Sequence, residues 1–182
     1  PVPPWIALPA KPTALTPDDS PPCGPLHRRR RAGAAVGAGF SLALACDIRI
    51  SAQSARFSAI FAKRALSPDY GCTQTLPIIV GIPKALELMY TGDIIDAVEA
   101  EQIGLVSRVV PDSELSEAAM KLSQKLADGP SVAHEFTKKL TYTAYTRNLE
   151  EQLWMEGQAS VVTGLTDDRK EGVNAFKERR EP

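Results

Sequence analysis

Small residues gather between positions 33 and 39, where glycines stand at 33, 37 and 39 with alanine and valine between them. The residues that follow, from Phe40 to Cys46, are apolar and favour a helix. A glycine-rich loop that opens a helix exposes unpaired backbone N–H groups, which can bind a phosphate or an oxyanion that forms during a reaction. A tight turn packed under a sheet has the same pattern, and the spacing alone leaves both interpretations open.

The elements around this segment follow from hydrophobic periodicity, caps and breakers. We expect a helix near 39–45, a strand near 46–51, a loop with a partial helix over 58–70, a helix over 72–80 broken by Pro77, and a helix over 84–90. Asp96 opens a short helix that ends at Gly104, and 105–110 is a strand. Ser113 caps a helix ending near Gly129, and further helices are predicted over 131–145, 149–162 and 168–179. The chain therefore begins as α/β and ends all-helical.

The whole-chain properties exclude several classes of protein. The 182 residues carry 21 basic and 22 acidic side chains, a formal net charge of -1, which argues against a general nucleic-acid binder. No apolar run reaches the length of a membrane span, so we expect no membrane association. Three cysteines without ligand spacing and only two histidines favour a reduced, cytoplasmic protein without a metal site.

Residues 1–31 differ from the rest, because nine of the fifteen prolines and a run of four arginines fall there. So many prolines disrupt both helix and strand periodicity. We interpret this segment as a disordered tail. Its abrupt transition near Gly33 suggests a shifted reading frame upstream, a hypothesis that translation of the neighbouring DNA in the other frames tests.

The residue pattern of the glycine-rich segment resembles a motif of the crotonase (enoyl-CoA hydratase/isomerase) superfamily. The family form A-x-G-G-G-x-x-L-A-x-x-C-D reads here Ala35-Val-Gly-Ala-Gly-Phe-Ser-Leu-Ala-Leu-Ala-Cys-Asp47. Further matches follow in order: Ala55-Arg-Phe57, Leu66-Ser-Pro-Asp69, Gly81, Leu88-Met-Tyr-Thr-Gly-Asp93, Ala97 through Gly104-Leu-Val-Ser107, and Thr166 to Phe176. The resemblance runs from about residue 33 to the C-terminus, and the number of ordered matches makes it specific.

The resemblance implies the crotonase-like α/β fold, a spiral of ββα units, here lacking its N-terminal part. Residues 1–31 are then a non-family segment, 32–112 a partial crotonase core, and 113–182 a helical region used for assembly into trimers or hexamers. It also implies an acyl-CoA thioester as the substrate, with coenzyme A arriving as part of that substrate and no other cofactor.

Crotonase-type enzymes stabilise an enolate oxygen with two backbone N–H groups. By resemblance Ala38, between Gly37 and Gly39, supplies one of them. The other belongs to the first half of the family domain and has no counterpart in residues 1–31. Assayed alone, this chain is therefore expected to be a poor catalyst.

Family hydratases use two glutamates, whose positions here hold Ser41 and Phe61. Serine is no base near neutral pH and phenylalanine bears no polar group. Family isomerases often place a catalytic aspartate where this chain has Asp69, and a carboxylate beside an acyl chain could move a proton between carbons. The alternative is that Asp69 caps the helix after Gly71.

The remaining candidate residues would bind the substrate. Phe61, Leu66 and Tyr70 would form an apolar wall around the acyl group, or simply belong to the core. Phe176 and Lys177 resemble the last family helix, which often packs on the CoA of a neighbouring subunit; a solvated terminal helix is the alternative.

We therefore expect an enoyl-CoA isomerase that works by proton transfer through an enolate. The alternatives are an enoyl-CoA hydratase with water held at Ser41, and a non-catalytic remnant that folds only within an oligomer. Turnover of a 3-enoyl-CoA and of a 2-enoyl-CoA separates these hypotheses.

Overall fold

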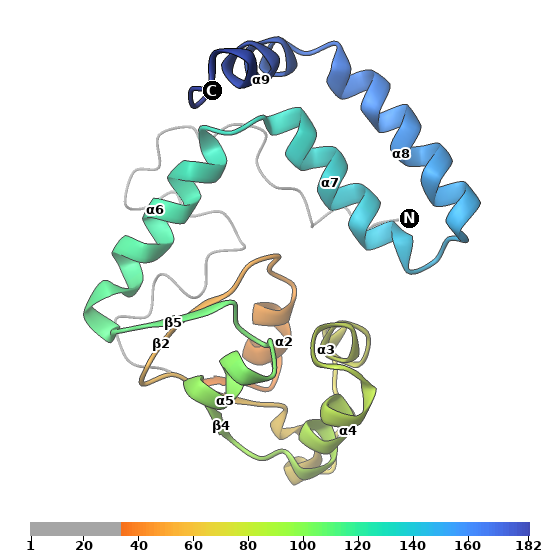
Figure 1. Ribbon diagram of the computed structural model, residues 1–182. Coiled ribbons are helices and arrows are strands. Elements are labelled where there is room, and N and C mark those ends of the chain that lie inside the picture. Colours follow the sequence, from red (N-terminus) through yellow and green to blue (C-terminus); the bar gives the residue numbers. More distant parts are fainter. Residues whose placement is uncertain (1–33) are drawn as a thin grey trace. The chain divides into compact units, whose positions relative to one another are not determined.

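The computed structural model describes residues 34–182, which divide into two compact units, 34–121 and 122–182 (Figure 1). The predicted tail over residues 1–31 lies outside the described residues. No helix among residues 34–182 is both long enough and apolar enough to cross a membrane.

Short strands form the centre of the first unit. β1 (Ala34–Val36) pairs in parallel with β3 (Arg56–Ser58), and β3 pairs antiparallel with β4 (Ile95–Asp96). A second sheet pairs β2 (Ile50–Ala52) in parallel with β5 (Arg108–Val110). Both parallel pairs need crossover connections, and the intervening helices supply them.

Helices and 3₁₀ turns connect these strands. They are α2 (Ala38–Leu44), the 3₁₀ helix η1 (Ile60–Arg64), α3 (Cys72–Val80), α4 (Ile82–Thr91) and α5 (Ala97–Gln102). α3 runs through Pro77 without a break, contrary to the sequence prediction. A proline there removes one hydrogen bond, to the carbonyl of Thr73, and Thr73 is an exposed residue.

The first unit has one hydrophobic core. Phe40 of α2 contacts Phe57 of β3 with ring centroids 6.5 Å apart, and Leu76 of α3 is fully buried. The other buried members include Leu44, Phe61, Cys72, Ala85, Leu88, Met89, Ile95, Leu105 and Val106. This core packs α2 against α3, and this close packing holds the glycine-rich segment at the start of α2 in place.

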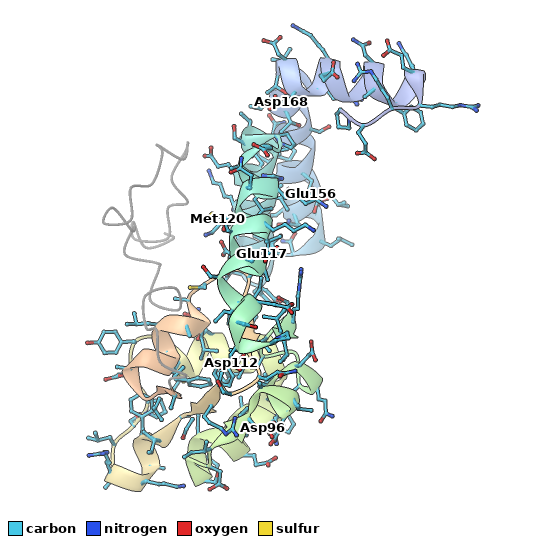
Figure 2. The ribbon with its side chains drawn as sticks, turned by 90° about the vertical axis from the view of Figure 1, so that its left-hand side faces the viewer. Asp96, Asp112, Glu117, Met120, Glu156 and Asp168 are labelled. Carbon is cyan, nitrogen blue, oxygen red and sulfur yellow. The ribbon has the colours of Figure 1, made fainter. Side chains whose placement is uncertain are left out.

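Local polar contacts fix the ends of these elements. The Asp96 side chain (Figure 2) accepts a hydrogen bond of 2.9 Å from the N–H of Glu99 and so caps α5, as the sequence predicted. Asp112, also labelled there, accepts from the backbone N–H of Ser54 at 3.2 Å and from its hydroxyl.

The C-terminal part of the chain is helical. A 3₁₀ turn, η2 (Asp112–Glu114), precedes α6 (Leu115–Ala127), so Ser113 lies inside that turn and does not cap the helix as predicted. The second unit contains α7 (Ser131–Ala144), α8 (Leu149–Gly164) and α9 (Asp167–Glu178). Side-chain oxygens of Asn148 and Thr166 cap α8 and α9.

Candidate active site

Gly37 forms the turn between β1 and α2. Its φ of 55° lies in the left-handed region that favours glycine. Its N–H donates to the carbonyl of Ser58 at 3.0 Å, which continues the β1–β3 pairing by one residue. The glycine-rich turn is thereby fixed to the sheet.

Ala38 begins α2, and its side chain is half-buried. As the first helical residue it has no acceptor within the helix for its own N–H. Among residues 34–182 no other acceptor for this N–H is found. The geometry therefore leaves the amide of Ala38 available as a hydrogen-bond donor.

Ser41 is fully buried one turn into α2. Its hydroxyl donates to the carbonyl of Gly37 at 3.3 Å, and its backbone N–H donates to the same oxygen at 3.0 Å. The proton of this hydroxyl is thus engaged by a protein group.

Cys72 is the residue that the sequence analysis missed. It is the first residue of α3 and is fully buried, in the helix that packs against α2. Burial is the main cause that raises the pKa of the Cys72 thiol; the negative charge of Asp69 also raises it, and the Ser41 hydrogen bond lowers it. No local pattern marks the burial of Cys72, since it depends on how α2 packs on α3.

Asp69 lies on an exposed turn immediately before α3. Its backbone carbonyl accepts from the N–H of Cys72 at 3.1 Å, and the next two residues, Tyr70 and Gly71, both have positive φ, 50° and 77°. The N-cap of α3 is Gly71. Among the described residues the Asp69 carboxylate has no hydrogen-bond or ion-pair partner, so its side chain does not cap α3.

The three residues predicted as an apolar wall lie in different environments. Phe61 is 6% exposed and belongs to the core of the first unit, which is the alternative that the sequence left open. Leu66 and Tyr70 are 59% and 63% exposed. They lie on the same loop as Asp69, within three positions of it in the sequence, and their side chains are exposed apolar surface.

Phe176 and Lys177 lie in α9, in the other unit, and Phe176 is 85% exposed. The nearby Arg180 pairs with Glu171 and Glu178, each at 2.6 Å. The hydrogen bond from Arg180 is the main cause that lowers the pKa of Glu171. The positive charge of Arg180 is therefore neutralised by carboxylates of α9.

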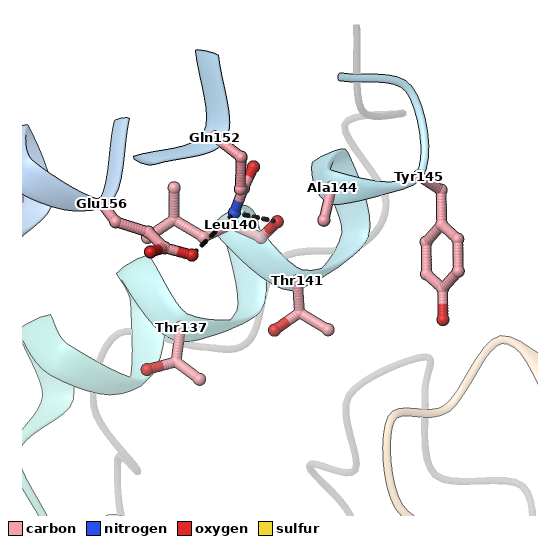
Figure 3. Close-up of a pocket in the computed structure, with 7 residues that line it drawn as sticks. All are labelled: Thr137, Leu140, Thr141, Ala144, Tyr145, Gln152 and Glu156. Carbon is pink, nitrogen blue, oxygen red and sulfur yellow. Dashed lines mark hydrogen bonds between the residues drawn. The ribbon is translucent and has the colours of Figure 1, made fainter. Parts of the chain in front are cut away.

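A hollow of about 470 Å³ lies between α7 and α8 (Figure 3). Gln152 reaches across it and donates to the carbonyl of Leu140 at 3.4 Å and to Glu156 at 3.2 Å. Thr137, Thr141, Ala144 and Tyr145 complete the lining. None of the residues predicted for chemistry lines this hollow.

Comparison with known proteins decides the family. A family model described as enoyl-CoA hydratase/isomerase matches residues 31–182. The chain belongs to this family. Its fold is the α/β crotonase fold, and the chain spans 54–58% of the length of three curated relatives that it matches.

Named members of the family carry both activities. The chain is 37% identical to the 1,2-epoxyphenylacetyl-CoA isomerase of Escherichia coli, with 82% of this chain and 57% of that protein aligned. The crystal structure of an enoyl-CoA hydratase from Bacillus anthracis matches with a TM-score of 0.78 at 41% identity, covering 82% of this chain and 58% of that one. A candidate hydratase from Thermobifida fusca, solved in complex with CoA, matches with a TM-score of 0.69 at 41% identity, covering 71% and 51%.

Proposed function

We propose that this chain forms part of an enzyme that moves the double bond of an enoyl-CoA by proton transfer. Binding of an acyl-CoA thioester is supported by family membership and by the related structure that holds CoA. The observation that favours isomerisation is the contrast between Ser41 and Asp69. The Ser41 hydroxyl is buried and engaged with protein groups, whereas the Asp69 carboxylate is exposed and has no partner among residues 34–182.

The proposed reaction begins with a 3-enoyl-CoA. The Asp69 carboxylate removes a proton from the carbon next to the thioester, and the electron pair of that C–H bond moves onto the thioester oxygen to give a dienolate. The N–H of Ala38 donates a hydrogen bond to this oxygen. Asp69 then returns the proton to the far carbon of the dienolate, which yields the 2-enoyl-CoA without net gain or loss of atoms.

Hydration is the second candidate, because hydratase names outnumber isomerase names among the relatives. It would require a group that takes a proton from water. At the two positions of the family glutamates this chain has Ser41 and Phe61, both buried and neither able to act as a base near neutral pH. Water chemistry at this site therefore lacks a recognisable base.

The test supplies a 3-enoyl-CoA and a 2-enoyl-CoA separately in D₂O and follows both by mass spectrometry. Isomerisation converts the first into a 2-enoyl-CoA. Exchange of the Asp69 proton with solvent would also place some deuterium on carbon. Conversion of the 2-enoyl-CoA into a 3-hydroxyacyl-CoA, without isomerisation, would contradict the proposal and favour the hydratase. Binding of CoA without turnover of either substrate would favour the non-catalytic alternative.

A further inference from the structure

The loop that carries Asp69 has, near each end, a residue in the left-handed conformation that is not glycine. Ala65, which ends η1, has φ 53° and ψ 33°, and Tyr70, which directly follows Asp69, has φ 50°. Among residues 34–182 three non-glycine residues have a positive φ, and this loop contains two of them. Most side chains are strained in this conformation, because their Cβ comes too close to a backbone carbonyl oxygen.

The strain at Ala65 belongs to the end of a helix. The N–H of Leu66 donates to the carbonyl of Phe61 at 3.1 Å, and the N–H of Ala65 donates to that of Ala62 at 3.0 Å. This pair of bonds is a Schellman ending, in which glycine usually occupies the left-handed position. Ala65 carries only a methyl group, so it presents little that a ligand could contact. It therefore serves as a control for strain without recognition.

The strain at Tyr70 belongs to a turn. Tyr70 and Gly71 are its central residues, and the N–H of Cys72 closes it by donating to the carbonyl of Asp69 at 3.1 Å. Both central residues have positive φ, 50° and 77°, the pattern of a type I′ turn, which asparagine followed by glycine commonly fills. A tyrosine at the first of these positions therefore raises the free energy of the folded state.

Packing within the chain does little to offset this strain. The Tyr70 side chain is 63% exposed, whereas Phe61, on the same segment, is 6% exposed and lies in the core. A side chain that buries so little apolar surface gains little from folding. Strained residues whose strain is not needed for packing tend to cluster at ligand-binding sites. The exposed ring of Tyr70 is available for contact with a bound molecule.

We propose that Tyr70 is a specificity-determining residue whose ring covers the apolar acyl chain of the substrate beyond the reacting carbons. Adjacent Cα atoms are about 3.8 Å apart, so a chain held at the Asp69 carboxylate is within reach of the neighbouring ring. Leu66, 59% exposed on the same loop, adds apolar surface. The preferred substrates are then 3-enoyl-CoA thioesters with an extended apolar chain, rather than 3-butenoyl-CoA. The inference rests on the proposed function, because it takes Asp69 as the base.

Thermal unfolding tests the strain without any substrate. Tyr70→Gly and Tyr70→Asn place residues that tolerate a positive φ, and each should raise the melting temperature by about 2–4 °C. Ala65→Gly should give a similar rise, since it relieves the same kind of strain, and Tyr70→Phe, which keeps the strain, should melt with the wild type. An unchanged or lower melting temperature in both Tyr70→Gly and Tyr70→Asn would overturn the inference, because the tyrosine would then serve stability.

Calorimetric binding of saturated acyl-CoA thioesters tests recognition without turnover. The wild type should bind octanoyl-CoA more tightly than butanoyl-CoA. Tyr70→Gly and Tyr70→Asn should weaken octanoyl-CoA binding about tenfold, the contribution of one or two buried methylene groups, and change butanoyl-CoA binding less than about twofold. Tyr70→Phe should keep the preference because it keeps the ring, and Ala65→Gly should keep it because it touches no recognising side chain. Equal affinity of the wild type for both thioesters would contradict the proposal.

Kinetics extend the test to the proposed reaction. In Tyr70→Gly and Tyr70→Asn, kcat/KM for 3-octenoyl-CoA should fall by about the same factor as the affinity, with 3-butenoyl-CoA nearly unaffected. The short substrate controls for any displacement of Asp69, because loss of the base would slow both substrates equally.

The proposed function and the role of Tyr70 can fail separately. Selective loss of octanoyl-CoA affinity, in a protein that isomerises neither 3-enoyl-CoA, would support acyl recognition by Tyr70 and contradict the proposed function. Isomerisation of both substrates with the same chain-length preference in wild type, Tyr70→Gly and Tyr70→Asn would support the proposed function and overturn the role of Tyr70.

Discussion

The hydroxyl of Ser58 donates a hydrogen bond to the carbonyl of Gly92, with the two oxygens 2.9 Å apart and both residues buried. The carbonyl of the same serine accepts from the N–H of Gly37. One residue of β3 therefore holds the glycine-rich turn on one side and the C-terminal end of α4 on the other.

Replacing Ser58 by alanine should destabilise the protein. The carbonyl of Gly92 would stay buried without its donor, which typically costs about 1–3 kcal/mol in the free energy of unfolding. Ser107→Ala is the matched control, because Ser107 makes a similar bond to the carbonyl of Arg49 at an exposed position and its loss should cost less. Urea denaturation measures both, and equal losses would show that burial of the Ser58 bond is unimportant.

The sequence predicted the elements well where the signals are local. The cap of α5 by Asp96 and the bounds of the helix over 72–80 are confirmed, because capping and periodicity act over a few residues, but the predicted break at Pro77 is absent from α3. The strand predicted near 46–51 is confined to Ile50–Ala52. The guanidinium of Arg49 donates to the carbonyls of Cys46 and Leu105. The bond to Cys46 closes a turn over residues 46–49, which therefore lie outside the strand.

The site was predictable only in part. The glycine-rich turn has a motif, and the left-handed φ of Gly37 explains why glycine stands there. The burial of Ser41 and Cys72 follows from the packing of α2 on α3, which joins segments far apart in sequence. Similarly, sequence could not separate Phe61 in the core from Leu66 and Tyr70 on the surface, because all three are simply apolar.

Cys72 should make stability depend on pH in the alkaline range. Its folded pKa is raised from about 9.0, so above that pH the unfolded chain loses a thiol proton that the folded state keeps. The free energy of unfolding is therefore unaffected well below pH 9 and falls as pH rises above it, by at most about 1.4 kcal/mol per pH unit. Urea midpoints of wild type and Cys72→Ser between pH 7 and 10 check this, since serine does not ionise. Parallel curves for the two proteins would contradict the prediction.

We expect the protein to associate, as the family resemblance implies. The second unit carries large exposed apolar side chains, among them Trp154 at 64% and Leu165 at 79% exposure. In the first unit Ile48 is also exposed, whereas Ile50 is buried in β2 and adds no apolar surface.

Light scattering at micromolar concentration should show trimers or hexamers. Trp154→Glu should weaken assembly, whereas Gln158→Glu, which adds the same charge at an exposed polar position of α8, should not. A monomeric wild-type protein would contradict the prediction.

Asp69 should matter more for turnover than Ser41. Asp69→Asn keeps the size of the side chain and removes the base, so isomerase turnover should fall by roughly 10²–10⁴. Asp69 makes its hydrogen bond to Cys72 through the backbone carbonyl, which the substitution leaves in place, so the fold should be unchanged. Ser41→Ala should be mild, because serine is no base near neutral pH and the hydroxyl donates to the Gly37 carbonyl.

The comparison needs a carboxylate that is exposed but has no proposed role. Asp93→Asn serves as this control, since Asp93 pairs only with the exposed Lys63 at 3.3 Å among the described residues. Because the isolated chain is expected to be slow, single-turnover experiments with enzyme in excess give the rate of the chemical step directly. If Ser41→Ala lost more activity than Asp69→Asn, water held at Ser41 would be the better explanation, and the assignment of Asp69 as the base would be wrong.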